Sequence, residues 1–208
     1  MTETHDVKRE LKECYAPRNT EWNIVDVPEL RFLAVDGRGD PNTAPAYRKA
    51  VEALYAVAYT IKFACRDELG RNAVVAPLEG LWWADDMEDF LTRRKENWQW
   101  RMLINIPHWV PAAMIDEARR TALAKKKLQA IEEVREELLH EGLSAQVLHI
   151  GSFDDETAAL IELHREYLPA HGLRERGAHH EIYLSDPRRT APEKLRTVLR
   201  QPVEAEPG

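Results

Sequence analysis

The sequence predicts an α+β fold in which a strand, a helix and two further strands form a βαββ unit that occurs twice. The stretches "RFLAVDGRGDP" and "AQVLHIGSFDD" each contain a short apolar run, a glycine and the acidic start of a helix. Further along, "RMLINIPH" and "RTVLRQPV" each place an Arg, an apolar run and a Pro at the same offsets. A chain of 208 residues is long enough to form one domain from two similar halves. We therefore expect two pseudo-symmetric βαββ repeats.

The first repeat is expected at about residues 31–106. Alternation of apolar and polar residues predicts strands at "WNIVDV" and "LRFLAVDGRG", and Pro28 between them is expected to end the first strand. The helix that follows should end at Gly70, because glycine readily adopts the left-handed conformation of a helix C-cap. Two more strands, which contain most of the tryptophans, complete this repeat.

The second repeat is expected at about residues 144–203, with its helix at 155–170 and a last strand after one helical turn. Between the repeats, apolar residues at helical spacing predict connecting helices over 111–140. Residues 1–20 are polar, and we expect them to be a poorly ordered lead-in to one domain over 21–203.

Composition excludes several classes of protein. The formal net charge is -7 and the charges are mixed along the chain, which argues against direct nucleic-acid binding. No stretch approaches the roughly 18 apolar residues of a membrane span. The first residues lack an apolar signal core, so a cytoplasmic location is expected. The two cysteines lie outside any CxxC pair and are expected to be free thiols.

A carboxylate lies in the middle of an apolar strand near the end of the chain. In "HHEIYLSD", alternation places His179, Glu181 and Tyr183 on one face. Burying the charge of Glu181 is costly unless it has a partner. Two interpretations of Glu181 are equally supported by the pattern: an ion pair with a nearby Arg at the sheet edge, or a residue of a binding site.

The internal repeat suggests which residues lie near Glu181. Aligning "PLEGLWWAD" with "HHEIYLSD" pairs Glu79 with Glu181 and places Trp83 on the same face. Six Trp are present, and four of them fall between Trp82 and Trp100. Each one alone is more simply explained by core packing, but as a group beside two acidic positions they indicate the wall of a pocket. Such a central cleft suits a flat hydrophobic or cationic molecule.

Metal chemistry finds little support in the sequence. His179 and Glu181 have the i, i+2 spacing that brings two ligands together on a strand, but no HExxH or CxxC pattern accompanies them. We expect neither a metal nor any other cofactor. His179 is kept as a candidate ligand contact, because it shares the face of Glu181.

Several long stretches resemble the GyrI-like small-molecule-binding superfamily, in its stand-alone bacterial branch. The resemblance covers about residues 20–203 and rests on "WQWRMLINIP", "VLHIGSFDDE" and above all "HHEIYLSDPRRTAPEKLRTVLRQPV". It implies two βαββ units of SHS2 type around a central ligand cleft, in agreement with the internal repeat. It also implies that Glu181 matches a buried Glu that meets cationic, aromatic ligands in multidrug-responsive regulators.

Stand-alone members of this superfamily that are similar to this chain hydrolyse cyclopropanoid, DNA-alkylating natural products. The resemblance therefore implies a cofactor-independent, detoxifying hydrolase in which Glu181 is the general base. Tyr183 is expected to position water or to polarise the substrate carbonyl. Trp83, Trp109 and Tyr55 are candidates for the walls of the pocket. Trp100 and Glu79 are further candidate ligand contacts.

Two other functions remain open at this stage. The protein could bind and sequester drug-like cations without turning them over, or it could act as an inhibitor of DNA gyrase, as the family name implies. For the hydrolase and for the sequestering protein, the expected partner is a hydrophobic or aromatic small molecule. The sequence does not decide between a monomer and a homodimer.

Overall fold

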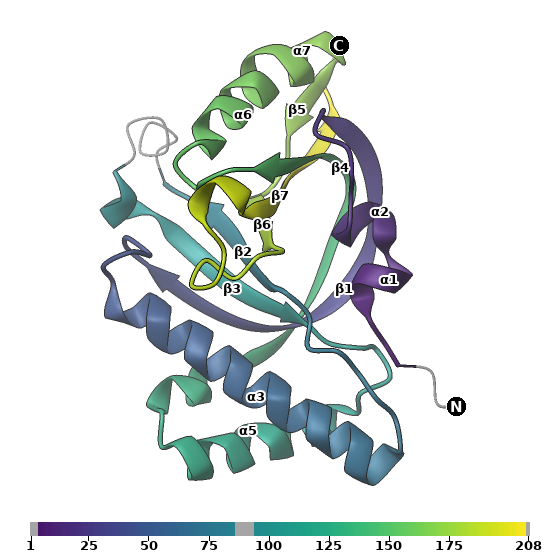
Figure 1. Ribbon diagram of the computed structural model, residues 1–208, viewed down its shortest axis with the longest axis vertical. Helices are drawn as coiled ribbons and strands as arrows, with labels where there is room; N and C mark the ends of the chain where they lie inside the picture. The colour runs from purple at the N-terminus through teal and green to yellow at the C-terminus, as the bar shows by residue number, and fades with distance from the viewer. Residues whose placement is uncertain (1–3, 86–93, 207–208) are drawn as a thin grey trace.

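An antiparallel, strongly curved sheet organises the chain (Figure 1). The structure is a computed structural model that describes residues 4–85 and 94–206. The order of the seven strands is β4-β1-β3-β2-β6-β7-β5, and an additional pairing of β4 with β7 closes the first six into a barrel. Strand β5 extends β7 outside that ring.

Each half of the chain contributes one βαββ unit. The first consists of β1 (Asn23–Arg38), α3 (Pro45–Leu69), β2 (Leu78–Trp83) and β3 (Gln99–Asn105). The second consists of β4 (Arg135–Ile150), α6 (Glu156–Glu162) with α7 (Leu168–Ala170), β6 (His179–Tyr183) and β7 (Arg196–Ala205). A π-helical turn, Leu163–Tyr167, joins α6 to α7.

The two units have the same strand order. The third strand lies between the first and the second in both, as β1-β3-β2 and as β4-β7-β6. Pairings of β1 with β4 and of β2 with β6 join the halves. The predicted pair of pseudo-symmetric βαββ repeats is therefore confirmed.

The remaining elements connect or flank these units. Among the described residues they are α1 (Val7–Glu10), α2 (Lys12–Tyr15), α5 (Ala112–Lys126), β5 (Leu173–Glu175) and the 3-10 turns Lys95–Asn97, Gln129–Glu133 and Pro192–Lys194. Helix α3 packs beside α5 at one end of the molecule, and α6 with α7 lies at the other (Figure 1). Within the described residues, no helix is both long and apolar enough to cross a membrane.

Helix α3 follows its sequence signals closely. Pro45 lies in its first turn, where its missing N–H has no helical partner to lose. Gly70 ends the helix with φ of 63°, the left-handed conformation expected there. Apolar residues at helical spacing, from Ala50 to Cys65, bury one face against the sheet.

Strand β1 is continuous, so the predicted break at Pro28 is wrong. Up to Arg31 the strand pairs with β4 alone, and β3 joins its other side only from Phe32. A proline is tolerated where a strand lacks a neighbour on one side, because no ladder hydrogen bond is lost there.

The prediction of helix over 111–140 is correct only in its first part. Helix α5 ends at Lys126, and the residues from Arg135 onward belong to β4. Their charges pair across strands: Arg135 with Asp36, and Glu136 with Arg31. These cross-strand ion pairs explain a charge pattern that resembles the solvated face of a helix.

Residues 4–20 are not a poorly ordered lead-in. They form α1 and α2, and His5 makes a β-bridge to Ala73. Tyr15 is completely buried and belongs to the main hydrophobic core. A buried aromatic ring, rather than local helix propensity, thus anchors this segment.

Candidate functional site

The register between β2 and β6 determines which side chains share a face. Gly80 lies opposite Glu181, Leu78 opposite Tyr183, and Trp82 opposite His179. A Cβ atom at Gly80 would lie 2.8 Å from Trp82 Nε1 and 3.1 Å from the Tyr183 hydroxyl. The glycine therefore leaves the space in which these two side chains meet.

A chain of hydrogen bonds leads from this point to Glu181. Trp82 Nε1 donates to the Tyr183 hydroxyl at 3.1 Å, and that hydroxyl donates to Glu181 Oε2 at 2.7 Å. The Tyr183 proton is thus directed at the carboxylate. Tyr183 fixes the orientation of Glu181 and cannot donate that proton elsewhere at the same time.

A groove of about 1750 Å³ opens above this face. Strands β2 and β6 form its floor, and α3 and α6 form its sides. Aromatic side chains from both halves line it: Tyr47, Tyr55, Tyr59, Phe63, Trp82, Trp83, Trp98, Phe153 and Tyr183. Tyr47 stacks on Trp82 with ring centroids 6.2 Å apart, and Phe153 meets Tyr183 edge-on at 5.8 Å. Such walls hold flat organic molecules by dispersion.

Burial raises the pKa of Glu181 to about 7. The hydrogen bond from Tyr183 opposes this shift, because it favours the charged form of the carboxyl group. At neutral pH a large fraction of Glu181 is therefore ionised and still basic enough to accept a proton, which suits a general base.

A second carboxyl group, that of Glu156, lines the same groove. Glu156 is only 5% exposed, and its Oε1 atom has no hydrogen-bond partner among the described residues. Burial, followed by the negative charge of Glu181, raises the pKa of Glu156 to about 10. Near pH 8, Glu181 is therefore mostly ionised, whereas Glu156 keeps its proton.

His179 also faces the groove, and it is uncharged. Its Nε2 atom lies 3.8 Å from Glu181 Oε1, and neither ring nitrogen has a hydrogen-bond partner in residues 4–85 and 94–206. Burial lowers the pKa of His179 to about 3. A neutral imidazole with free nitrogen atoms is available to a polar group of a ligand.

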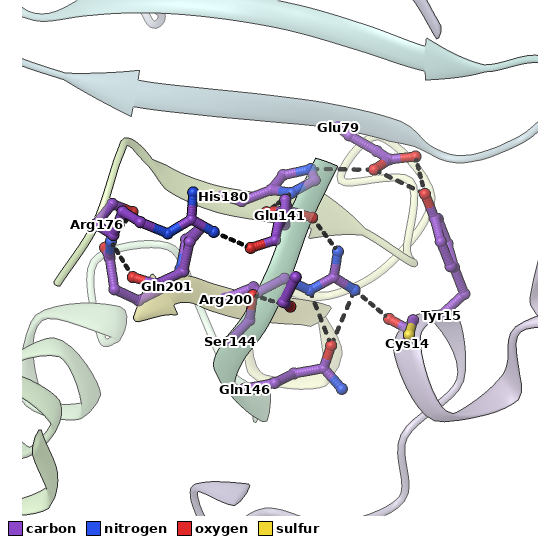
Figure 2. A network of polar contacts seen from close by, with 12 residues as sticks. Cys14, Tyr15, Glu79, Glu141, Ser144, Gln146, Arg176, His180, Arg200 and Gln201 are labelled. Carbon is purple, nitrogen blue, oxygen red and sulfur yellow. Dashed lines mark hydrogen bonds and ion pairs between the residues drawn. The ribbon is translucent and has the colours of Figure 1, made fainter. Parts of the chain in front are cut away.

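The opposite face of β6 carries a different kind of arrangement (Figure 2). His180 Nε2 lies 3.0 Å from Glu79 Oε2, and His180 Nδ1 lies 2.9 Å from Glu141 Oε1. The Tyr15 hydroxyl donates to Glu79 at 3.0 Å, and Arg200 Nη1 pairs with Glu141 at 2.7 Å. We call these five residues the buried network.

Charges in the buried network support one another. Burial acts to lower the pKa of His180, but the negative charge of Glu141 and hydrogen bonds to both carboxylates raise it to about 9. For Glu141 burial acts to raise the pKa, and the charges of His180 and Arg200 lower it to about 2. His180 is therefore a cation held between two carboxylates, and its role is structural.

A group of at least three His, Cys, Asp or Glu side chains placed to hold a metal ion is absent from the described part of the chain.

Comparisons with known proteins agree with this architecture. The family of GyrI-like small molecule binding domains matches residues 20–204. The chain belongs to this family. Its groove between the two βαββ units thus belongs to a GyrI-like small-molecule-binding domain.

Two solved structures from Listeria innocua share the GyrI-like fold of this chain along almost its whole length. An uncharacterized conserved protein is 38% identical with a TM-score of 0.86, and a hydrolase is 37% identical with a TM-score of 0.84. Each alignment covers 96% of this chain and 100% of that chain. The C-terminal domain of EcmrR, at 10% identity and a TM-score of 0.55 over 89% of this chain and 98% of that chain, shares the fold alone. No curated protein matches the chain.

The structure brings five of the predicted site residues together in the groove of the GyrI-like domain: Tyr55, Trp83, His179, Glu181 and Tyr183. The edge ion pair proposed for Glu181 would need a nearby arginine, and the sequence offers Arg174, Arg176 and Arg188 near this strand. None of the three pairs with Glu181: Arg174 pairs with Glu204, Arg176 donates to the carbonyl oxygen of Glu141, and Arg188 pairs with Asp186.

Three predicted site residues lie elsewhere. Glu79 is completely buried on the opposite face, because the register aligns Gly80 rather than Glu79 with Glu181. Trp100 is buried beneath Tyr47, and its ring occupies the space where a side chain at residue 37 would be. Trp109 packs against Arg71, with the guanidinium carbon 4.1 Å from the ring centroid.

Other groove residues were not predicted from the sequence. Tyr47 reads as an ordinary residue on the buried face of α3, and Phe153 and Glu156 read as the start of a helix. The sequence does contain one indication that Glu156 has another role. It is the third acidic residue in a row in "SFDDE", and a single carboxylate is enough to cap the start of a helix.

Proposed function

We propose that the protein is a cofactor-independent hydrolase that opens the cyclopropane ring of cyclopropanoid DNA-alkylating compounds and so detoxifies them. The observation that carries this proposal is Glu181. Its pKa of about 7 and its hydrogen bond to Tyr183 suit a general base, and it lies at the floor of an aromatic groove.

In the proposed reaction Glu181 accepts a proton from a water molecule that attacks the strained ring. Tyr183 holds Glu181 in place by a hydrogen bond. In this mechanism Tyr183 orients the base, and it does not polarise the substrate carbonyl. The stacked rings of Tyr47 and Trp82 give a flat substrate a defined position. General-base catalysis contributes about 10²–10⁴-fold, so positioning and release of ring strain must supply the remainder.

Charge in the groove supports a neutral substrate over a cation. Lys and Arg side chains outnumber Asp and Glu among the described lining residues, and Glu156 is itself protonated at neutral pH. A site for sequestering cations is better served by an excess of ionised carboxylates. The hydrolase description of the Listeria innocua relative gives further support.

The test is to incubate the protein with a cyclopropane-bearing alkylator and to follow the ring-opened product by mass spectrometry. Glu181→Gln should lower turnover by about 10²–10⁴-fold, because the amide cannot accept a proton. Ligand affinity, measured by quenching of tryptophan fluorescence, should change only a few-fold.

Glu193→Gln is the matched control, since Glu193 is exposed and lies outside the groove. Binding without product formation by the wild type would reject the hydrolase and leave sequestration as the function. Full turnover by Glu181→Gln would remove Glu181 from the mechanism.

A further inference from the structure

We propose that Glu156 is the proton donor of the ring-opening reaction, delivering its carboxyl proton to the substrate oxygen that gains charge as the ring opens. This inference rests on the proposed function and adds a second catalytic group to it. It also specifies the substrate, whose cyclopropane must be conjugated to a carbonyl group.

A donor other than Tyr183 is needed. When the ring of such a substrate opens, the electron pair of the breaking C–C bond moves to the carbonyl oxygen, which must be protonated or stabilised. The Tyr183 hydroxyl already donates to Glu181 Oε2 at 2.7 Å. The base and its supporting hydroxyl are therefore both engaged on the side of the water molecule.

The position of Glu156 fits the missing role. The turn that precedes α6 packs over β6, because Phe153 meets the Tyr183 ring edge-on at 5.8 Å. This turn brings Glu156 into the lining of the groove, where Glu181 lies on the floor. Glu156 is nine-tenths buried or more, and its Oε1 atom has no partner among the described residues. A buried polar atom without a partner is costly, which points to a partner supplied by a ligand.

The charges around Glu156 keep its proton in place. Glu181 and Tyr183 face it from β6, Asp154 from its own turn, and Lys95 from the 3-10 turn before β3. Burial and the negative charge of Glu181 raise its pKa to about 10, and the Thr197 hydroxyl and the positive charge of Lys95 oppose this rise. His179 is a weaker candidate donor, because a neutral imidazole N–H is a far weaker acid than a carboxyl group.

The step balances without any other reactant. The oxygen of water forms a bond to the ring CH₂ carbon, the ring C–C bond breaks, and its electrons pass to the carbonyl oxygen. Water gives one proton to Glu181, and Glu156 gives one proton to that oxygen. The product is the substrate plus one molecule of water. Transfer of a proton from Glu181 to Glu156 then restores the starting state.

The experiment compares Glu156→Gln with the wild type in the ring-opening assay between pH 6 and pH 10. Glutamine keeps the size of the side chain but cannot release a proton, so turnover should fall by about 10²–10³-fold. The wild-type rate should fall as the pH rises toward 10, and this alkaline decline should vanish in the variant. Glu162→Gln, an exposed position on the same helix, is the control that keeps full activity.

A second measurement does not depend on turnover. Infrared spectra of the wild type at pH 8 should contain the carbonyl band of a protonated carboxyl group, and Glu156→Gln should lack that band. An ionised Glu156 at pH 8, or full turnover by Glu156→Gln, would overturn the donor role while leaving the hydrolase intact. Absence of turnover in the wild type would instead reject the hydrolase itself, and the donor role with it.

Discussion

Adjacent histidines on β6 have opposite protonation states. His180 is completely buried and His179 is partly buried, and the loss of hydration alone lowers the pKa of each. His180 lies between two carboxylates and has a pKa of about 9, whereas His179 lacks hydrogen-bond partners among the described residues and has a pKa of about 3. The difference comes from the partners that each face of the strand offers.

The two faces of β6 therefore have different tasks. In the buried network, charged groups satisfy one another and fix the strand in place. On the groove face, His179, Glu181 and Glu156 keep polar atoms that a ligand can engage. The satisfied rear face (Figure 2) thus supports a front face whose polar groups line the groove.

The largest effect is expected from breaking the rear face. Glu141→Ala leaves Arg200 and His180 without their shared carboxylate, and losing one partner of a buried ion pair costs about 3–5 kcal/mol. Urea denaturation should show this loss in the free energy of unfolding. Glu117→Ala, which breaks a surface pair with Arg120, should leave the denaturation midpoint unchanged. Equal urea midpoints for Glu141→Ala and Glu117→Ala would show that the buried network does not stabilise β6.

The next effect concerns how stability depends on pH. Between pH 7 and pH 9, folded protein keeps protons on His180 and Glu156 that the unfolded chain has lost, because both folded pKa values are raised. Unfolding releases these protons, so the free energy of unfolding should fall as the pH rises, by about 1.4 kcal/mol per pH unit for each proton.

Glu156→Gln removes one of the two contributions and should roughly halve that slope. Thermal unfolding in buffers from pH 7 to pH 9 measures it. If the free energy of unfolding depends on pH equally in Glu156→Gln and the wild type, Glu156 is ionised in the folded protein, and its pKa is not raised as the structure indicates.

The smallest effect is a change in the pH dependence of turnover. Tyr183→Phe removes the hydrogen bond that lowers the pKa of Glu181, so that pKa should rise above 7. The acid limb of kcat/KM should move to higher pH, and a pKa shift of one unit should lower activity at pH 7 about fivefold. Tyr167→Phe, outside the groove, is the control. An unmoved acid limb would mean that Tyr183 does not set the basicity of Glu181.

Sequence periodicity was sufficient for the repeat, for α3 and for the face of β6 that carries Glu181. Failures came where pairing between distant strands decides the outcome. The internal alignment paired Glu79 with Glu181, but a register one residue away puts Gly80 there and turns Glu79 to the other face. A shift of this size leaves the composition and the pattern of both strands unchanged.

The aromatic residues illustrate a second limit. Trp82 and Trp100 are directly opposite one another and share a face, yet only Trp82 lines the groove. Tyr47, from helix α3, covers Trp100, with ring centroids 5.3 Å apart. Which tryptophan is exposed thus depends on how a helix lies on the sheet, and no local pattern contains that information.

The hydrogen bond from Arg200 to the carbonyl oxygen of Cys14 joins residues 186 positions apart. It has a consequence for synthesis of the protein. Residues of α2 leave the ribosome long before β7 exists, so this hydrogen bond cannot form until almost the whole domain has been synthesised. Contacts this distant in sequence slow folding, because a long loop must close before they form. A nascent chain that is stalled before Arg200 should therefore leave α2 more open to protease than the same helix is once β7 has paired with β4.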